Sequence, residues 1–185
     1  MALTLEDIGI LLCRHGHAQY SGEPVTQLEH ALQSALLAEA SGADDELITA
    51  ALLHDLGHLL GETTVDTPSL HGIDDLHQYK VIPFLRGLFS ERVLQAIAGH
   101  VDAKRWLCAE RPDYHAGLSE DSRRSLLLQG GVFTPEQAAA FITRPYAQDA
   151  VRLRLWDDLA KQPALETPPL AHYLALAQRC ALAPA

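Results

Sequence analysis

Residues 44–60 read DDELITAALLHDLGHLL and join an apolar helical pattern to a cluster of potential metal ligands. The apolar residues recur at helical spacing, which predicts one helix over about 44–60. On such a helix His54 and His58 are four positions apart and share a face. Asp55 has two carboxylate oxygens and is suited to bridging two cations. For these residues alone, a helix end with ordinary polar side chains remains an equal alternative.

The rest of the chain shows further helical segments separated by Gly and Pro. Helices are predicted over about 4–13, 26–41, 73–86, 90–107, 119–128, 134–143, 145–161 and 168–182. Thr4, Ser119 and Thr134 are suitable N-caps, and Gly42 is a suitable C-cap.

Three segments lack helical periodicity. Residues 14–25 are punctuated by Gly and Pro and predict a loop, residues 61–72 predict a flexible loop beside the site, and residues 108–118 predict an irregular segment. The alternating pattern of strands is nearly absent. The sequence therefore predicts an all-α helical bundle that forms a single domain over residues 1–185.

The composition is that of a soluble globular protein, with 48% hydrophobic and 21% charged residues among 185. A formal net charge of −10 disfavours nucleic acid as the main partner, because that binding needs a basic surface. Three widely spaced cysteines without a CxxC pair indicate reduced thiols, so we expect a cytoplasmic protein. The sequence does not open with a charged stretch followed by an apolar one, and it contains no apolar run of membrane-spanning length, so we expect neither a leader nor a membrane partner.

Ten histidines against one methionine suggest metal ligation. His30, His77, His100 and Asp157 each lie on a different predicted helix, and each alone fits an ordinary core or surface residue. Together with the His-Asp pair at 54 and 55, they would place ligands on five helices, as helical bundles do when they build metal sites.

Two ligand positions have neighbours that compete for the same role. His71 is an alternative to His77, although it lies in the Pro- and Gly-containing loop. Asp158 is an alternative to Asp157, and periodicity does not choose between them. Arg154 is also placed to form an ordinary surface ion pair with Asp158.

The order H…HD…H…H…D resembles the HD-domain superfamily over about residues 20–160. The resemblance implies an HD-domain helical bundle with two metal ions. One ion would be bound by His30, His54, Asp55 and Asp157, and the other by Asp55, His77 and His100. Nitrogen and oxygen ligands without thiolate suit iron or manganese, and they do not exclude zinc or magnesium.

Further segments resemble the PhnZ-like branch of oxygenases. These are the Tyr20-x-x-Glu23 pattern ahead of the first His, HVDAKRWLC at 100–108, Ser122, LQGG at 128–131 and RLRLWDD at 152–158. The resemblance implies a mixed-valent Fe(II)/Fe(III) pair that uses O2 to cleave the carbon–phosphorus bond of a 1-hydroxyphosphonate, with release of inorganic phosphate. Examples are 2-amino-1-hydroxyethylphosphonate and its trimethylammonio analogue, and the smaller hydroxymethylphosphonate remains open.

The resemblance also implies roles for three residues near the metal ligands. Tyr20 would occupy an open iron position until substrate displaces it. Glu23 would help to hold this tyrosine and would receive the polar end of the substrate, where an amino or quaternary ammonium group would suit it. His58 would form a hydrogen bond to the substrate. Without the resemblance, Tyr20 and Glu23 would be ordinary loop residues.

Three polar side chains are candidates for binding the phosphonate. Lys104 follows His100 by four positions, and Arg154 precedes Asp157 by three, so on helices each projects beside a metal ligand. Ser122 would add a hydroxyl donor. The alternative for Lys104 is a solvated helix end.

Two other functions compete with the oxygenase hypothesis. The first is a metal-dependent HD phosphohydrolase that acts on a nucleotide or a phosphate monoester through a metal-bound hydroxide. The second is a non-catalytic HD module that senses a ligand, which is disfavoured because no ligand of the motif is missing.

Overall fold

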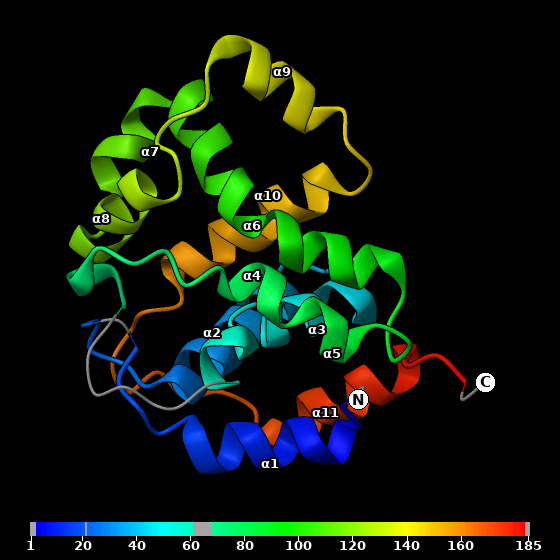
Figure 1. The fold of residues 1–185 in the computed structure, drawn as a ribbon. Coiled ribbons are helices and arrows are strands. Elements are labelled where there is room, and N and C mark those ends of the chain that lie inside the picture. The colour runs from blue at the N-terminus through cyan, green and yellow to red at the C-terminus, as the bar shows by residue number, and fades with distance from the viewer. Residues whose placement is uncertain (1–2, 21, 61–67, 184–185) are drawn as a thin grey trace.

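The computed structural model describes residues 3–20, 22–60 and 68–183, which form helices joined by short loops (Figure 1). The helices are α1 (Leu5–His15), α2 (Gln27–Ala40), α3 (Asp45–Leu53), η1 (Leu56–Leu59), η2 (Pro68–His71), α4 (His77–Lys80), α5 (Ile82–Leu85), α6 (Glu91–Glu110), α7 (Pro112–Gly117), α8 (Glu120–Leu128), α9 (Pro135–Ile142), α10 (Ala147–Leu159) and α11 (Leu170–Cys180). Within the described ranges there is no β-sheet, only two isolated bridges. The prediction of an all-α bundle is confirmed.

The helix starts follow from local hydrogen bonding. Thr4, Thr26 and Thr134 each accept the amide of the third helical residue, whose own side chain binds back to the cap. These capping boxes satisfy amides that the helix leaves unpaired. Ser119 caps α8 in the simpler way, through its side chain alone. Gly42 follows α2 with a φ of +74°, which glycine adopts without steric cost.

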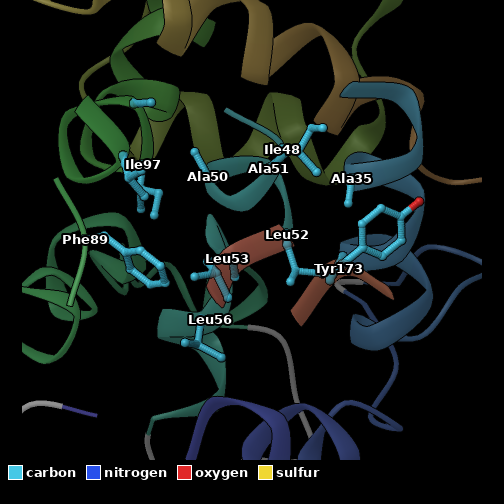
Figure 2. Packing of buried hydrophobic residues seen from close by; sticks show 14 of the residues in the cluster. Ala35, Ile48, Ala50, Ala51, Leu52, Leu53, Leu56, Phe89, Ile97 and Tyr173 are labelled. Carbon is cyan, nitrogen blue, oxygen red and sulfur yellow. The ribbon is translucent and has the colours of Figure 1, made fainter. Parts of the chain in front are cut away.

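Helix α3 lies at the centre of the bundle. Every residue from Leu47 to Leu53 is buried, and α2, α6, α10 and α11 all pack against this helix (Figure 1). Figure 2 shows Leu52 and Leu53 between Phe89 on one side and Tyr173 on the other. Because α3 is enclosed, the residues that follow it also start in the interior.

Helices α6 and α10 pack along each other and form the other half of the bundle. A smaller apolar cluster that includes Phe133, Phe141 and Val151 joins them to α9. A Cβ on Gly99 would lie 3.0 Å from the Cβ of Ala150, so the two helices approach closely beside His100. This contact fixes the spacing between the ligands that the two helices carry.

The predicted helix over 44–60 is wrong in its second half. Helix α3 ends at Leu53, and η1 begins at Leu56. The imidazole Nδ1 of His54 binds the carbonyl oxygen of Ala51 at 2.9 Å, which satisfies a carbonyl at the helix end. Because the helix stops there, the argument that His54 and His58 share a helix face does not hold.

Two further boundaries differ from the prediction. Residues 73–76 are not helical, because the side chains of Asp74 and Asp75 accept the amides of Leu76 and His77. The expectation that 108–118 is irregular is wrong, since α6 continues to Glu110 and α7 begins at once with proline in its first position.

The flexible loop predicted over 61–72 lies largely outside the described residues, which leave out 61–67. Within its remaining part, Pro68–His71 form η2. In the portion of the chain that is described, no helix combines the length and hydropathy needed to cross a membrane.

Candidate metal centre

Asp55 lies at the middle of a buried cluster of imidazoles. Its Oδ2 atom is 3.5 Å from Nε2 of His30 and 3.4 Å from Nε2 of His54. Its Oδ1 atom is 3.3 Å from Nε2 of His77 and 3.7 Å from Nε2 of His100. One carboxylate therefore faces two pairs of imidazoles, one pair at each oxygen.

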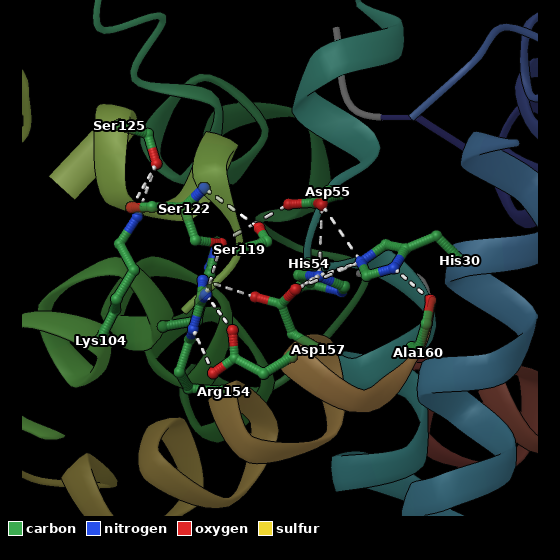
Figure 3. A network of polar contacts seen from close by, with 12 residues as sticks. His30, His54, Asp55, Lys104, Ser119, Ser122, Ser125, Arg154, Asp157 and Ala160 are labelled. Atoms are coloured by element: carbon green, nitrogen blue, oxygen red, sulfur yellow. Dashed lines mark hydrogen bonds and ion pairs between the residues drawn. The ribbon is translucent and has the colours of Figure 1, made fainter. Parts of the chain in front are cut away.

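Asp157 completes the first pair. Its Oδ1 atom is 3.4 Å from Nε2 of His30 and 4.0 Å from Nε2 of His54 (Figure 3). Potential ligand atoms thus gather in a first group, His30–His54–Asp157, and a second group, Asp55–His77–His100, and within each group they lie within 4.8 Å of one another. All six residues of these two groups are buried. A third group, His58–Asp75–His77, shares His77 with the second, and its other two residues are only partly buried.

The second ring nitrogen of each imidazole has its own acceptor. Nδ1 of His30, His54 and His100 binds a backbone carbonyl oxygen at 2.7 to 2.9 Å. Nδ1 of His77 is 2.8 Å from Oδ1 of Asp75. A carbonyl oxygen can only accept, so those Nδ1 atoms carry the proton and Nε2 is left with a lone pair.

The four Nε2 lone pairs face one another rather than a donor. The Nε2 atoms of His30 and His54 are 3.2 Å apart, and those of His77 and His100 are 3.1 Å apart. Oδ2 of Asp55 is buried and has no hydrogen-bond partner in the described part of the chain. Converging lone pairs around an unpartnered carboxylate oxygen need cations, so the donor set fits two metal ions.

The charges of the cluster are strongly coupled to one another. Burial alone would lower the pKa of His30, but the carboxylates of Asp157 and Asp55 outweigh it and raise the pKa to about 9. Asp55 and Asp75 likewise outweigh burial and raise the pKa of His77 to about 9. The pKa of His100 lies well below its usual value because of burial and the neighbouring imidazoles. The raised pKa values mean that Nε2 of His30 and of His77 readily takes up a positive charge, which is a proton as long as no metal ion is bound.

Tyr20 closes one side of the first group. Its ring stacks on the imidazole of His30 with centroids 3.8 Å apart, and its hydroxyl is 3.5 Å from Oδ1 of Asp157. Burial and the charge of Asp157 raise the pKa of Tyr20, so the phenol stays protonated. The tyrosine hydroxyl thus lies beside the first ligand group.

A group of cations and hydroxyls lies beside the metal ligands. Nη1 of Arg154 is 2.7 Å from Oδ2 of Asp157, and Nη2 donates to Oγ of Ser122 at 3.3 Å (Figure 3). Lys104 donates to Oγ of Ser125 at 2.8 Å. Lys104, Ser122 and Arg154 are all buried. Lys104 therefore is no solvated helix end.

Among the residues that the structure describes, no carboxylate pairs with Lys104, in contrast to Arg154. Burial and the charge of Arg154 lower the pKa of Lys104 to about 7. An anion bound between these cations would relieve their repulsion, which is the electrostatic signature of an anion site.

Comparison with known proteins identifies the family of the chain. A model of the HD domain matches residues 28–180. The chain belongs to the HD-domain family. It is 44% identical over 170 residues to hydroxymethylphosphonate dioxygenase of Gimesia maris, which covers 92% of this chain and 84% of that protein. It is 37% identical over 179 residues to [1-hydroxy-2-(trimethylamino)ethyl]phosphonate dioxygenase (glycine-betaine-forming) of Leisingera caerulea, and this alignment covers 95% of this chain and 89% of that protein.

These relatives confirm the resemblance to the PhnZ-like branch of HD-domain oxygenases. The HD motif itself falls where the main chain leaves α3. Had the helix continued, adjacent residues would point about 100° apart. The turn after Leu53 instead brings His54 and Asp55 to the same centre.

The structure separates the two pairs of competing ligands. His71 lies exposed at the end of η2, whereas His77 is buried in the cluster. Asp158 pairs with Arg154 and Tyr114 outside the ligand groups, whereas Asp157 lies inside one. Arg154 contacts both aspartates and is buried, so the pair is not a surface ion pair.

Asp75 is a residue that the sequence analysis did not single out. Its two oxygens bind Nδ1 of His77 at 2.8 Å and Nδ1 of His58 at 2.6 Å. His58 stacks on His77, and its Nε2 is 3.8 Å from Oδ1 of Asp55. Asp75 therefore orients one metal ligand and one cavity residue together. Its place two residues before a ligand was the available signal.

Lys161 was also missed. Its Nζ is 3.0 Å from Oε1 of Glu23, a residue expected to receive substrate, and 3.3 Å from Oγ of Ser119. The contact joins residues 138 positions apart, which no local pattern reveals.

A cavity of about 60 Å³ opens onto the cluster. Its lining includes Tyr20, His58, Lys104, Ser122, Arg154 and Lys161, together with ligands from both metal groups. The volume corresponds to roughly five water molecules, which suits a small polar ligand. Of the substrate residues expected from sequence, Glu23 does not line this cavity.

Proposed function

We propose that this HD-domain protein is a dioxygenase that cleaves the carbon–phosphorus bond of a 1-hydroxyphosphonate with O2 and releases inorganic phosphate. The observation that carries the proposal is the cavity between the His/Asp cluster and the buried cations Lys104 and Arg154. A ligand there can reach the metal groups and the cations at once. Both named relatives are phosphonate dioxygenases.

The donor set fits two iron ions. His30, His54, Asp55 and Asp157 would hold one ion, and Asp55, His77 and His100 would hold the other. When bound as a mixed-valent Fe(II)/Fe(III) pair, these ions would supply the redox chemistry that dioxygen requires.

The phosphonate group would be bound by the cation side of the cavity. Lys104 and the Nη2 side of Arg154 can donate to its oxygens, and Ser122 adds a hydroxyl that already faces Arg154. Asp157 and Asp158 hold the guanidinium in place, so binding would need little rearrangement. These contacts would orient the carbon that carries the hydroxyl toward the metal ligands.

Tyr20 and His58 would act on the other side of the reacting carbon. The hydroxyl of Tyr20 lies beside Asp157, so substrate entering the first group has to displace it. His58 is held by Asp75 and can form a hydrogen bond to the substrate through Nε2. Both side chains also exclude bulk water from the cluster.

The overall reaction needs no external reductant. A 1-hydroxyphosphonate and one O2 give a carboxylic acid and phosphate; a carbon–phosphorus bond and a carbon–hydrogen bond break, and new bonds to oxygen form at carbon and phosphorus. The electrons that reduce dioxygen all come from the substrate carbon.

The test is phosphate release from three compounds with and without O2: 2-amino-1-hydroxyethylphosphonate, its trimethylammonio analogue and hydroxymethylphosphonate. We expect at least one to release phosphate only when both Fe(II) and O2 are present, and metal analysis to find about two irons per chain. Equal release without O2 would indicate the alternative, an HD phosphohydrolase. Magnesium or manganese alone in active protein would also overturn the oxygenase proposal.

A further inference from the structure

The side chain of Lys161 reaches the cavity from a rigid segment just after α10. The residue before it, Ala160, accepts Nδ1 of the metal ligand His30 at 2.8 Å. The residue after it, Gln162, exchanges two hydrogen bonds with the side chain of Gln33, at 2.8 and 3.0 Å. Lys161 is thus anchored to α2 on both sides, and its position is set by the fold.

The ammonium group of Lys161 lies next to the first metal group. Its Nζ is 5.8 Å from the ring centroid of Tyr20, the ring that stacks on His30. It also contacts Oγ of Ser119, the N-cap of the helix that carries Ser122. Lys161 therefore lies between Tyr20 and the start of helix α8, which carries Ser122, a candidate for binding the phosphonate.

Glu23 is already neutralised by this lysine. The two side chains are 3.0 Å apart and only 15% and 14% exposed, so solvent screens the pair weakly. Lys161 lines the cavity, whereas Glu23 does not. A substrate entering the cavity therefore meets an ammonium group where sequence reasoning expected a carboxylate.

Other acidic residues that line the cavity are engaged as well. Asp75 binds His58 and His77, and Asp121 pairs with Arg124 at 3.0 Å. Asp74 accepts the backbone amide of Leu76, which gives it a hydrogen bond but leaves its charge in place. A cationic substituent would gain no new carboxylate at Glu23 and would be repelled by Lys161 at close range.

We propose that Lys161 is a specificity-determining residue that excludes 1-hydroxyphosphonates with a cationic substituent and selects those with a small uncharged one, of which hydroxymethylphosphonate is the simplest. The inference rests on the proposed function and names its substrate class. In the preferred reaction, hydroxymethylphosphonate and one O2 give formate and phosphate.

The test compares the binding of two ligands to iron-loaded protein without oxygen, by calorimetry: hydroxymethylphosphonate and [1-hydroxy-2-(trimethylamino)ethyl]phosphonate. Wild-type protein should prefer the first by at least about tenfold, and Lys161→Met should reduce that preference by about tenfold because it removes the repulsion and frees Glu23. Affinity for hydroxymethylphosphonate itself should change little. Lys80→Met, at an exposed lysine, is the matched control.

Glu23→Gln is a second variant, in which the preference for hydroxymethylphosphonate should increase instead of decrease. The substitution leaves Lys161 without its carboxylate partner, so the ammonium group should repel the cationic ligand more strongly. An unchanged preference in both variants would overturn the inference. A large loss of hydroxymethylphosphonate affinity in Lys161→Met would also overturn it, because the lysine would then be a phosphonate ligand.

Oxygen-dependent release of phosphate and formate separates this inference from the proposed function. Turnover of hydroxymethylphosphonate without any effect of Lys161→Met on selectivity would refute the role of Lys161 alone. If none of the phosphonates is converted, both proposals fail.

Discussion

Lys104→Met should stabilise the protein while it weakens anion binding. Burial and Arg154 lower the pKa of Lys104 from 10.5 to about 7. The unfolded chain therefore binds a proton between pH 7 and 10.5 that the folded protein does not hold, and stability rises with pH over this range. By linkage, burying Lys104 lowers the free energy of unfolding by about 4 kcal/mol at pH 7. This destabilisation is fully present below pH 7 and disappears above pH 10.5. Losing the hydrogen bond to Ser125 costs about 1 kcal/mol.

At pH 7 the free energy of unfolding of Lys104→Met should therefore exceed that of wild type by about 3 kcal/mol, which corresponds to a rise in Tm of roughly 5–10 °C in calorimetry. The gain should shrink as the pH is raised toward 10. Titration with inorganic phosphate should show a Kd about 100-fold higher than in wild type, because a buried charge that faces the anion is gone. Metal content should stay the same, and Lys80→Met should change neither quantity. A lower Tm with unchanged phosphate affinity would refute the reasoning and make Lys104 a structural residue.

Three further substitutions probe the metal centre. Asp55→Ala should lose both metal ions in elemental analysis, because this carboxylate faces both ligand groups; retention of one ion would show that it does not bridge. Asp75→Ala should weaken metal retention at the second group by about tenfold in a chelator competition, since His77 loses its orienting carboxylate, and unaltered retention would contradict that role. Gly57→Ala should lower Tm and deplete the second group, because a Cβ there would lie 2.1 Å from the carbonyl oxygen of His77; a variant with native Tm and full metal content would refute this.

The helices could be predicted from sequence largely because their starts are encoded locally. A Thr or Ser cap and the first helical turn lie within a few residues of each other, as at Thr26 and Thr134. Helix ends were less predictable. The end of α3 at Leu53 follows from the hydrogen bond of His54 to Ala51 and from the close approach of Gly57 to His77, and the second contact is not local in sequence.

The ligand order could be recognised, whereas the supporting contacts could not. His30 and Asp157 follow the spacing of the HD motif, and the structure places them together. The pairing of Lys161 with Glu23 depends on how the segment after α10 docks on α2, which a one-dimensional pattern does not contain. The selectivity that we propose for Lys161 therefore rests on a contact that the sequence alone does not predict.

The distribution of ligands along the chain also sets an order of events during synthesis. Asp55, His77 and His100 have all been made once the ribosome has passed residue 100, but the other group waits for Asp157 on α10. Helix α10 packs on α6 and brings that aspartate to His30. A complete first group of ligands can therefore form only once α10 has been made and packs against α6. A chain that stalls before α10 would carry a half-built centre able to hold metal at one position.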